Sequence, residues 1–221
     1  MVRRSGPLIL GLTGSIAMGK SETAGMFRRL RVPVFDSDAE VHRLLRQDGP
    51  AVGPVSAAFP GVMRAGAIDR QALGEHVFEN DSKLCILEEI VHPLVSHARR
   101  RFLRIAGVAR ASVVLVDVPL LFETGGDVNC DAVVVVSAPG FVQRQRAMAR
   151  PSMSADKLEA ILARQMPDSV KRQRADFVIP TGIGKRTALL AICKILKIIT
   201  GDALCGHRCW SRRRVLARSC S

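Results

Sequence analysis

The 221-residue sequence is poor in aromatic residues: it contains no tyrosine, a single tryptophan and 4% aromatic residues in total. Proteins that bind single-stranded nucleic acid without sequence preference stack the bases on aromatic side chains, so this low content argues against that class. The formal net charge of +13 would attract polyanions, but the arginines are scattered through expected helices and the extreme C-terminus instead of forming one stripe. We interpret the charge as that of a generally basic protein or of a site for a phosphorylated ligand, and expect no nucleic-acid partner.

Regular cysteine spacing is also missing. Six cysteines are spread through the chain without the pattern of a disulfide framework, and a chain of this length can bury a sufficient core without disulfides. A reducing compartment, the cytoplasm, is therefore the simpler expectation. Cys205, His207 and Cys209 form a Cys-x-His-x-Cys pattern, but no convincing fourth ligand completes a zinc site.

Long apolar runs are the third absence. Residues 187–199 are apolar but include Lys194 and Lys197 and are too short to span a bilayer, so they predict an amphipathic helix. Residues 7–12 follow two arginines, as in a signal peptide, yet they lead directly into a Gly-Lys-Ser loop, which favours a buried first strand. We expect no membrane-spanning segment.

What the sequence does contain is a series of short apolar runs that alternate with helical patterns. Five runs predict buried strands, at residues 8–12, 32–35, 112–118, 132–136 and 176–179. Helical patterns occur at residues 21–31, 39–47, 141–149, 154–166 and 186–200. Buried strands that alternate with helices indicate an α/β fold with a parallel, doubly wound sheet.

Between residues 51 and 110 no strong strand pattern appears. Asp69 and Asp81 are each expected to start a helix, and His92-Pro93 to restart a third. We therefore predict a core formed by residues 7–38 and 111–200, interrupted by a helical substrate-binding insertion at 39–110. The Cys- and Arg-rich residues 201–221 are expected to form a disordered tail.

The strongest functional signal directly follows the first expected strand. Residues 14–21 read Gly-Ser-Ile-Ala-Met-Gly-Lys-Ser, which matches the P-loop pattern of Gly, four residues and Gly-Lys-Ser. In such a loop the backbone N–H groups surround a phosphate, and the following helix adds the positive end of its dipole. Lys20 would reach the β- and γ-phosphates of ATP, and the Ser21 hydroxyl would ligate Mg²⁺. The strand before it and the helix after it favour a phosphate site over a chance glycine-rich turn.

Acidic residues at two other strand ends extend this pattern. Asp117 ends the apolar run 113–117, where a Walker-B-type carboxylate holds Mg²⁺, although many buried strands end in Asp without such a role. Asp36-Ser37-Asp38 follow the second strand, at the edge where open α/β sheets bind ligands. One of these two aspartates is expected to cap the next helix, and the other would accept the proton of an attacking hydroxyl. We assign the base to Asp36.

Several arginines from Arg144 to Arg164 fall in the expected helices that follow the fourth strand. A run of this kind usually marks a solvated helix face. Beside a P-loop, however, it is typical of a closing lid whose arginines neutralise the transferring phosphoryl group and exclude water.

Taken together, these residues resemble the dephospho-CoA kinase family over about residues 8–201. Beside the P-loop, the shared segments are Val34-Phe35-Asp36-Ser37-Asp38 followed by His42, Gly66-Ala67-Ile68-Asp69-Arg70, Leu87-Glu88-Glu89-Ile90-Val91-His92-Pro93-Leu94-Val95, Val118-Pro119-Leu120-Leu121-Phe122-Glu123 and Ala175-Asp176-Phe177-Val178-Ile179. Other P-loop kinases share the Gly-Lys-Ser loop but lack the His-Pro-Leu-Val and Pro-Leu-Leu-Phe-Glu segments, so the resemblance is specific.

The resemblance implies a three-layer P-loop kinase core with a five-stranded parallel sheet, a helical CoA-binding insertion and a lid at about residues 141–166. It implies that the γ-phosphate of ATP is transferred, with Mg²⁺, to the ribose 3′-hydroxyl of dephospho-CoA, the last step of coenzyme A synthesis. Carried onto this sequence, catalysis would depend on Lys20 and Asp36, and the metal on Ser21 and Asp117. The implied ATP site comprises Gly14, Ser15, Ala17, Met18, Gly19, Lys20, Ser21, Glu22 and Arg144, and the implied acceptor site comprises Asp36, Asp38, His92, Pro119, Leu120 and Glu123.

Three segments depart from the family pattern. Glu22 stands where a Thr is usual, and its carboxylate would repel the α-phosphate unless it turns outward. Ala17-Met18 replaces a pair of the Gly-Ser type, which predicts a less compliant loop. Pro180-Thr181-Gly182 replaces an Asp-Asn type segment and should alter the contacts on the adenine side.

Two alternatives remain at this level. A kinase for another nucleoside or nucleotide would share most of these features, and a panel of acceptors would separate the two. Glu22 and the basic tail motivate the second alternative, a catalytically inactive nucleotide-binding regulator. We expect a monomer or a weak homo-oligomer.

Overall fold

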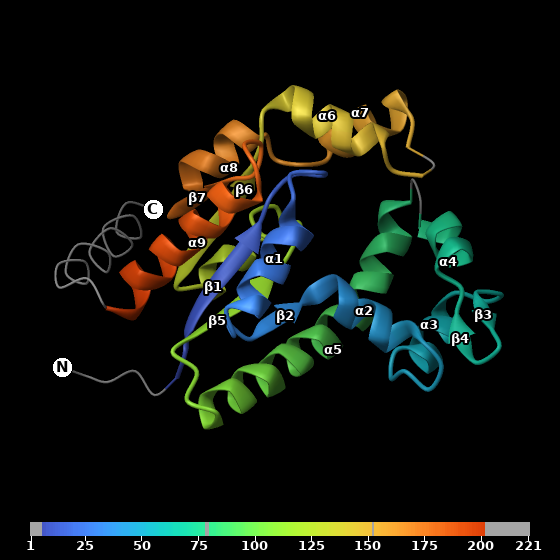
Figure 1. Cartoon of the computed structure of the whole chain (residues 1–221). Coiled ribbons are helices and arrows are strands. Elements are labelled where there is room, and N and C mark those ends of the chain that lie inside the picture. Colours follow the sequence, from blue (N-terminus) through green and yellow to red (C-terminus); the bar gives the residue numbers. More distant parts are fainter. Residues whose placement is uncertain (1–5, 78–79, 152, 202–221) are drawn as a thin grey trace, which may run out of the picture. The chain divides into compact units, whose positions relative to one another are not determined.

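The computed structural model describes residues 6–77, 80–151 and 153–201 (Figure 1). The chain forms two compact units. The first comprises the chain up to Val34 and from Arg110 onward, and the second comprises Phe35–Ala109. The expected tail, apart from Gly201, lies outside the described residues. Among the helices that are described, none combines the length and the apolar composition needed to cross a bilayer.

A five-stranded parallel sheet with the order β2-β5-β1-β6-β7 confirms the expected α/β fold. The strands are β1 (Leu8–Thr13), β2 (Val34–Asp36), β5 (Val113–Asp117), β6 (Ala132–Ser137) and β7 (Phe177–Pro180). Each lies within one or two residues of its predicted range, because a short continuous apolar run is typical of strands in a parallel sheet covered on both faces. β2 is an edge strand and contains the boundary between the two units.

Strand β6 shows how the sheet divides the core of the first unit. Val134 and Val136 belong to the cluster that contains the apolar faces of α1 (Lys20–Arg29) and α9 (Lys185–Thr200). Val133 and Val135 belong to a second cluster, with Leu121, Phe122 and Cys130. Since successive side chains of a strand point to opposite faces, the sheet is covered on both sides, which is the layered arrangement of a doubly wound fold.

The remaining helices of the first unit follow β5 and β6. They are the short 3₁₀ helix η1 (Gly126–Asn129), α6 (Gly140–Met148), α7 (Ala155–Ala163) and α8 (Asp168–Arg174). The sequence predicted one helix over 154–166, whereas the chain ends α7 at Ala163 and starts α8 after Pro167. Ser154, the first residue of that predicted range, caps α7 by accepting from the N–H of Lys157. Helix α8 escaped prediction because its sequence, Asp-Ser-Val-Lys-Arg-Gln-Arg, has no apolar period.

The second unit is mainly helical and has a core of its own. Its elements are α2 (Ser37–Leu45), α3 (Val52–Ala58), β3 (Met63–Arg64), β4 (Ala67–Ile68), α4 (Arg70–Val77) and α5 (Asp81–Val108). The core contains Leu44, Leu45, Val55, Phe59 and Leu73, among others. Asp69 caps α4 by accepting hydrogen bonds from the N–H groups of Gln71 and Ala72, as the sequence indicated. The antiparallel pair β3–β4, two residues a strand, is a small addition to the expected all-helical segment.

Helix α5 corrects a prediction. The sequence led us to expect a break at His92-Pro93 and a cap at Asp81, whereas α5 runs through Pro93 without interruption and is capped by Asn80, whose side chain accepts from the N–H of Lys83. A proline inside a helix costs about 3 kcal/mol. The apolar stripe continues across the proline, because Leu87, Leu94 and other residues at helical spacing pack against the core of the second unit, and this packing outweighs the local cost.

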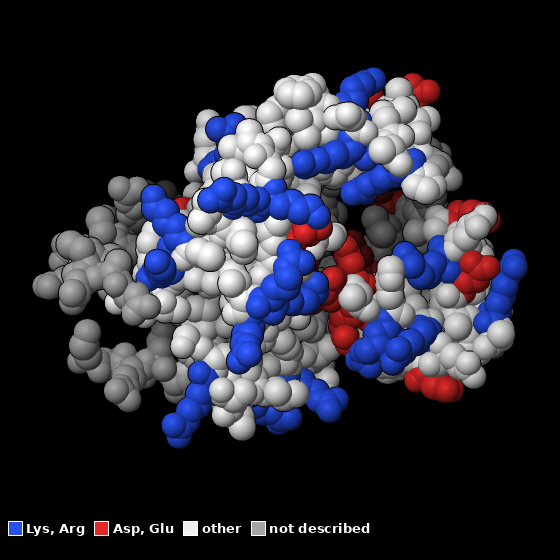
Figure 2. Space-filling view, viewed as in Figure 1, with Lys and Arg blue, Asp and Glu red and all other residues white. Residues whose placement is uncertain are grey.

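Lys and Arg side chains lie in several separate areas of the face shown in Figure 2. They do not form one continuous stripe there. This distribution agrees with the scattered positions of the arginines in the sequence.

Candidate active site

The loop between β1 and α1 carries the P-loop sequence and has the backbone turns that it needs. Ala17 and Gly19 adopt left-handed conformations, with φ of 60° and 90°. At Gly14, a Cβ atom would lie 2.4 Å from Cγ2 of Val136 and 2.8 Å from its carbonyl oxygen, so only glycine fits against β6. Such turns at a helix N-terminus are the geometry through which backbone N–H groups surround an anion.

Ala17 and Met18 show how this loop tolerates its unusual residues. A left-handed conformation costs an alanine about 1–2 kcal/mol, but the Ala17 side chain is buried in a cluster with Ala147 and Leu158 of α6 and α7. The Met18 side chain is buried in the main core, and its Sδ accepts a hydrogen bond from the N–H of Ala138 at 3.1 Å. Met18 can therefore reach a phosphate only through its backbone.

Lys20 and Asp117 come together at the end of the sheet. The register aligns Leu12 of β1 with Asp117 of β5, so both strands end at the same edge. Nζ of Lys20, the first residue of α1, lies 2.8 Å from Oδ1 of Asp117, whose side chain is only 2% exposed. The structure thus unites the expected phosphate-binding lysine with the expected metal-binding carboxylate.

Two glutamines hold the P-loop through a single residue, Ile16. Oε1 of Gln165 accepts from the Ile16 N–H at 3.0 Å, and Nε2 of Gln143 donates to the Ile16 carbonyl oxygen at 2.9 Å. Gln143 lies on α6 and Gln165 follows α7. The segment expected to form a lid is therefore hydrogen-bonded to the phosphate loop.

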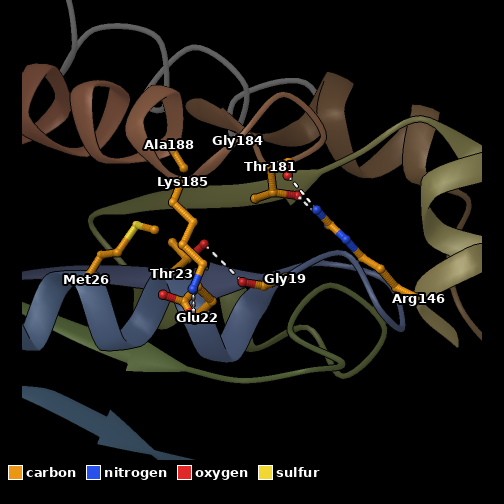
Figure 3. Close-up of a pocket in the computed structure, with 9 residues that line it drawn as sticks. All are labelled: Gly19, Glu22, Thr23, Met26, Arg146, Thr181, Gly184, Lys185 and Ala188. Atoms are coloured by element: carbon orange, nitrogen blue, oxygen red, sulfur yellow. Dashed lines mark hydrogen bonds and ion pairs between the residues drawn. The ribbon is translucent and has the colours of Figure 1, made fainter. Parts of the chain in front are cut away.

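A pocket of about 270 Å³ opens beside the start of α1 (Figure 3). It is lined by Gly19, Glu22, Thr23, Met26, Arg146, Thr181, Gly184, Lys185 and Ala188. The Thr181 hydroxyl donates to the Met18 carbonyl oxygen at 2.6 Å, and Nη2 of Arg146 donates to the Thr181 carbonyl oxygen at 2.8 Å. Thr181, in the segment that departs from the family pattern, thus joins the P-loop to α6.

The two neighbouring arginines of α6 behave differently. Arg144, the residue expected to contact ATP, forms an ion pair with Glu159 of α7 at 2.9 Å, and both side chains are more than half exposed. Arg146 instead points into the pocket (Figure 3). The structure therefore adds Arg146 to the candidate ATP site.

Glu22 lies on the pocket wall and turns toward two cations. Its carboxylate lies 3.3 Å from Nζ of Lys185 and 3.4 Å from Nη2 of Arg29. The hydrogen bond from Lys185, and then that from Arg29, lower the pKa of Glu22. The side chain is therefore a carboxylate at neutral pH, which pairs with these two cations while it lines the pocket.

Glu123 is tied to a buried lysine. Its Oε1 accepts from the Met166 N–H at 2.9 Å and lies 2.8 Å from Nζ of Lys171, whose side chain is fully buried. Burial raises the pKa of Glu123, but the hydrogen bonds from Lys171 and from the Met166 N–H outweigh it and leave the pKa lowered. Pro119 and Leu120 are the other residues of this segment that were assigned to the acceptor site. Leu120 is exposed, and the Pro119 carbonyl oxygen accepts a hydrogen bond from the Thr13 hydroxyl.

Asp36, Asp38 and His92 belong to the second unit. Oδ1 of Asp36 accepts from the Ala39 N–H at 3.0 Å and caps α2. Asp38 lies in the first turn of that helix, and His92 is an exposed residue of α5. The sequence interpretation gave the cap to one aspartate and left Asp36 for catalysis, whereas the cap is Asp36 itself, because its extended backbone places the carboxylate over the free N–H groups of α2.

Comparison with known sequences decides the family. Residues 8–183 match the dephospho-CoA kinase family. The chain belongs to the dephospho-CoA kinase family. A dephospho-CoA kinase from Rhodospirillum rubrum is 53% identical over 206 residues, which cover 93% of this chain and 96% of the relative. The resemblance seen in the sequence motifs is thereby confirmed.

Solved structures agree with this assignment. A Thermus thermophilus protein superposes with a TM-score of 0.76 at 33% identity, over 86% of this chain and 96% of its own. The dephospho-CoA kinase of Campylobacter jejuni superposes with a TM-score of 0.65 at 26% identity, over 88% of this chain and 98% of its own. A dephospho-CoA kinase is a transferase that acts on an alcohol group, so the chain is assigned to that class of enzyme.

Sequence reasoning missed three residues that contact candidate site residues: Gln143 and Gln165, which bond the P-loop, and Lys171, which pairs with Glu123. Gln143, Gln165 and Lys171 stand in polar helical stretches where nothing in the pattern distinguishes them from solvent-exposed residues. The buried state of Lys171 could have been suspected only from Glu123, because an acid in an apolar segment requires a partner.

Proposed function

We propose that this protein transfers the γ-phosphate of ATP to the ribose 3′-hydroxyl of dephospho-CoA, giving coenzyme A and ADP. The observation that carries the proposal is the 2.8 Å pair of Lys20 and Asp117 at a P-loop, beside a pocket that Arg146 lines, in a chain of this family. The expected nucleotide-kinase core, helical insertion and lid at about 141–166 are part of the same proposal.

The P-loop is the proposed triphosphate site. Backbone N–H groups of the loop and the dipole of α1 favour an anion there. Lys20, which lies 2.8 Å from Asp117, would exchange that carboxylate for the β- and γ-phosphates. Removing charge repulsion between these phosphates and the attacking oxygen is the main catalytic task in phosphoryl transfer.

Ser21 and Asp117 are the proposed ligands of Mg²⁺. A hydroxyl and a carboxylate oxygen suit this cation, which takes most of its other ligands from water and from the phosphates of the nucleotide. Among the described residues no cluster of three His, Cys, Asp or Glu side chains could hold a metal by itself, and a kinase metal site does not need one. Mg²⁺ supplies charge neutralisation of the transferring phosphoryl group when bound.

The pocket beside α1 is the proposed place of the nucleoside. Arg146, Thr181 and Gly19 all line it (Figure 3). Arg144 stays in the proposal as a lid contact, and it would have to leave Glu159 to reach ATP.

Asp36 is the proposed general base. A carboxylate has two oxygens and several lone pairs, so the cap that Oδ1 provides for α2 does not use its capacity to accept the proton of the 3′-hydroxyl. Asp38, His92, Pro119, Leu120 and Glu123 are the proposed acceptor-binding residues.

A coupled assay of ADP release on the purified protein tests the proposal. Dephospho-CoA should stimulate ADP release in the presence of Mg²⁺, and nucleosides or nucleotides without the pantetheine arm should not. Asp36→Asn should lower turnover by about two orders of magnitude or more and leave ATP binding nearly intact. A loss of less than about tenfold would show that Asp36 is not the base, and absence of acceptor-dependent ADP release would refute the function.

A further inference from the structure

The pocket beside the P-loop contains an acid at an unfavourable place for a nucleotide enzyme. Glu22 directly follows Lys20-Ser21 in the first turn of α1, the turn whose N–H groups are proposed to hold phosphate. A negative charge there stabilises the helix by interacting with its dipole. The same charge opposes a triphosphate at the same helix end, because both anions compete for one positive potential.

Lys185, which lines the same pocket from α9, is also in an electrostatically unfavourable position. It is the first residue of α9, is followed by Arg186, and the first turn of α9 contains no acidic residue. A cation at a helix N-terminus is disfavoured by the dipole. The charge that offsets this arrangement comes from another helix, since Nζ of Lys185 lies 3.3 Å from the Glu22 carboxylate (Figure 3).

We propose that Lys185 is a charge-compensating residue of the nucleotide site, which holds the Glu22 carboxylate on the pocket wall and thereby allows ATP to bind beside it. The inference rests on the proposed function and assigns Lys185 a positioning role through Glu22.

Arg29 provides a matched comparison. It also pairs with Glu22, at 3.4 Å, but it lies in the last turn of α1 and does not line the pocket. If any cation near Glu22 sufficed, Arg29 and Lys185 would be interchangeable. Of these two cations, Lys185 lines the pocket and Arg29 does not. The loss of Lys185 should therefore weaken nucleotide binding more than the loss of Arg29.

A double-mutant cycle tests the proposal. The probe is a non-hydrolysable ATP analogue with Mg²⁺, and its affinity is measured by titration calorimetry at low salt for the wild type, Glu22→Gln, Lys185→Met and the double variant. Lys185→Met should weaken binding about five- to tenfold, because Glu22 is then free to face the phosphates. In the Glu22→Gln background the same change should weaken binding less than about twofold, and raising the salt concentration should shrink the first effect.

Arg29→Met is the matched control, and it should change the affinity less than about twofold. All these positions are exposed, so the variants should keep the thermal unfolding midpoint of the wild type, which is checked alongside. Equal weakening by Lys185→Met in both backgrounds would overturn the proposal and show that Lys185 contacts the nucleotide directly. Absence of any weakening would also overturn it. Failure of the wild type to bind the analogue would instead count against the proposed function.

Discussion

Two lysine–carboxylate pairs of the first unit have the same length and opposite surroundings. Lys20 lies 2.8 Å from Asp117 and Lys171 lies 2.8 Å from Glu123. The Lys20 side chain is 16% exposed at the mouth of the P-loop, whereas that of Lys171 is fully buried. A lysine that water can reach can exchange its carboxylate for another anion, and a sealed one cannot. Each pair has one nearly buried partner, which is Asp117 (2% exposed) in the first and Lys171 (0%) in the second. The comparison teaches that the exposure of the lysine, rather than the distance, separates an exchangeable cation from a permanent one.

Lys20→Met should show the largest effect, on activity. Loss of one cation that contacts the transferring phosphoryl group is expected to lower kcat by about 10²–10³-fold or more, measured with the coupled assay. A variant with more than a tenth of wild-type activity would break the comparison, because Lys20 would then be only structural.

Lys171→Met should show the second largest effect, on stability. Removing one partner of a buried pair leaves an uncompensated charge and typically costs about 3–5 kcal/mol of unfolding free energy, measured by urea denaturation. The exposed Lys194→Met is the control and should stay within about 0.5 kcal/mol of the wild type. A variant as stable as the control would show that the buried pair contributes nothing.

Acid should test the same pair without mutation. The pKa of Glu123 is lowered in the folded protein from its ordinary value of 4.5. The stability that the pair contributes is therefore fully present above about pH 4.5 and is lost as the pH falls through the lower native pKa. Unfolding free energies measured from pH 7 to pH 3 should fall more steeply below pH 4.5 in the wild type than in Glu123→Gln. Parallel curves would contradict the lowered pKa.

A neutral contact should give the smallest effect. Gln165→Leu removes the acceptor of the Ile16 N–H and should raise KM for ATP about three- to tenfold, the equivalent of one hydrogen bond. KM for dephospho-CoA should stay unchanged. Gln165→Glu, which keeps an acceptor at the same place, should restore part of the loss, and an equal rise of both KM values would show a general structural defect instead.

The sequence sufficed for features that are encoded within a few neighbouring residues. The P-loop, the strand ending in Asp117 and the cap at Ser154 each depend on local spacing and local backbone geometry, and the structure has all three. The five strands could be located because each falls in a short, nearly continuous apolar run.

Features that depend on which face of a helix meets the rest of the protein could not be predicted. Arg144 and Arg146 are two residues apart, about 200° around a helix of 3.6 residues per turn, so only one of them can line the pocket. Local sequence does not say which. The continuity of α5 through Pro93 is a similar case, because the packing that outweighs the proline comes from residues distant in the chain.

The order of the strands has a consequence for synthesis on the ribosome. β1 is the central strand, and both of its neighbours, β5 and β6, come after Arg110 in the chain. The second unit, Phe35–Ala109, is contiguous, so all of it leaves the exit tunnel while β1 still lacks a partner. Domains generally fold as units during translation. The apolar strand β1 therefore stays unpaired and exposed to solvent until β5 and β6 have been synthesised.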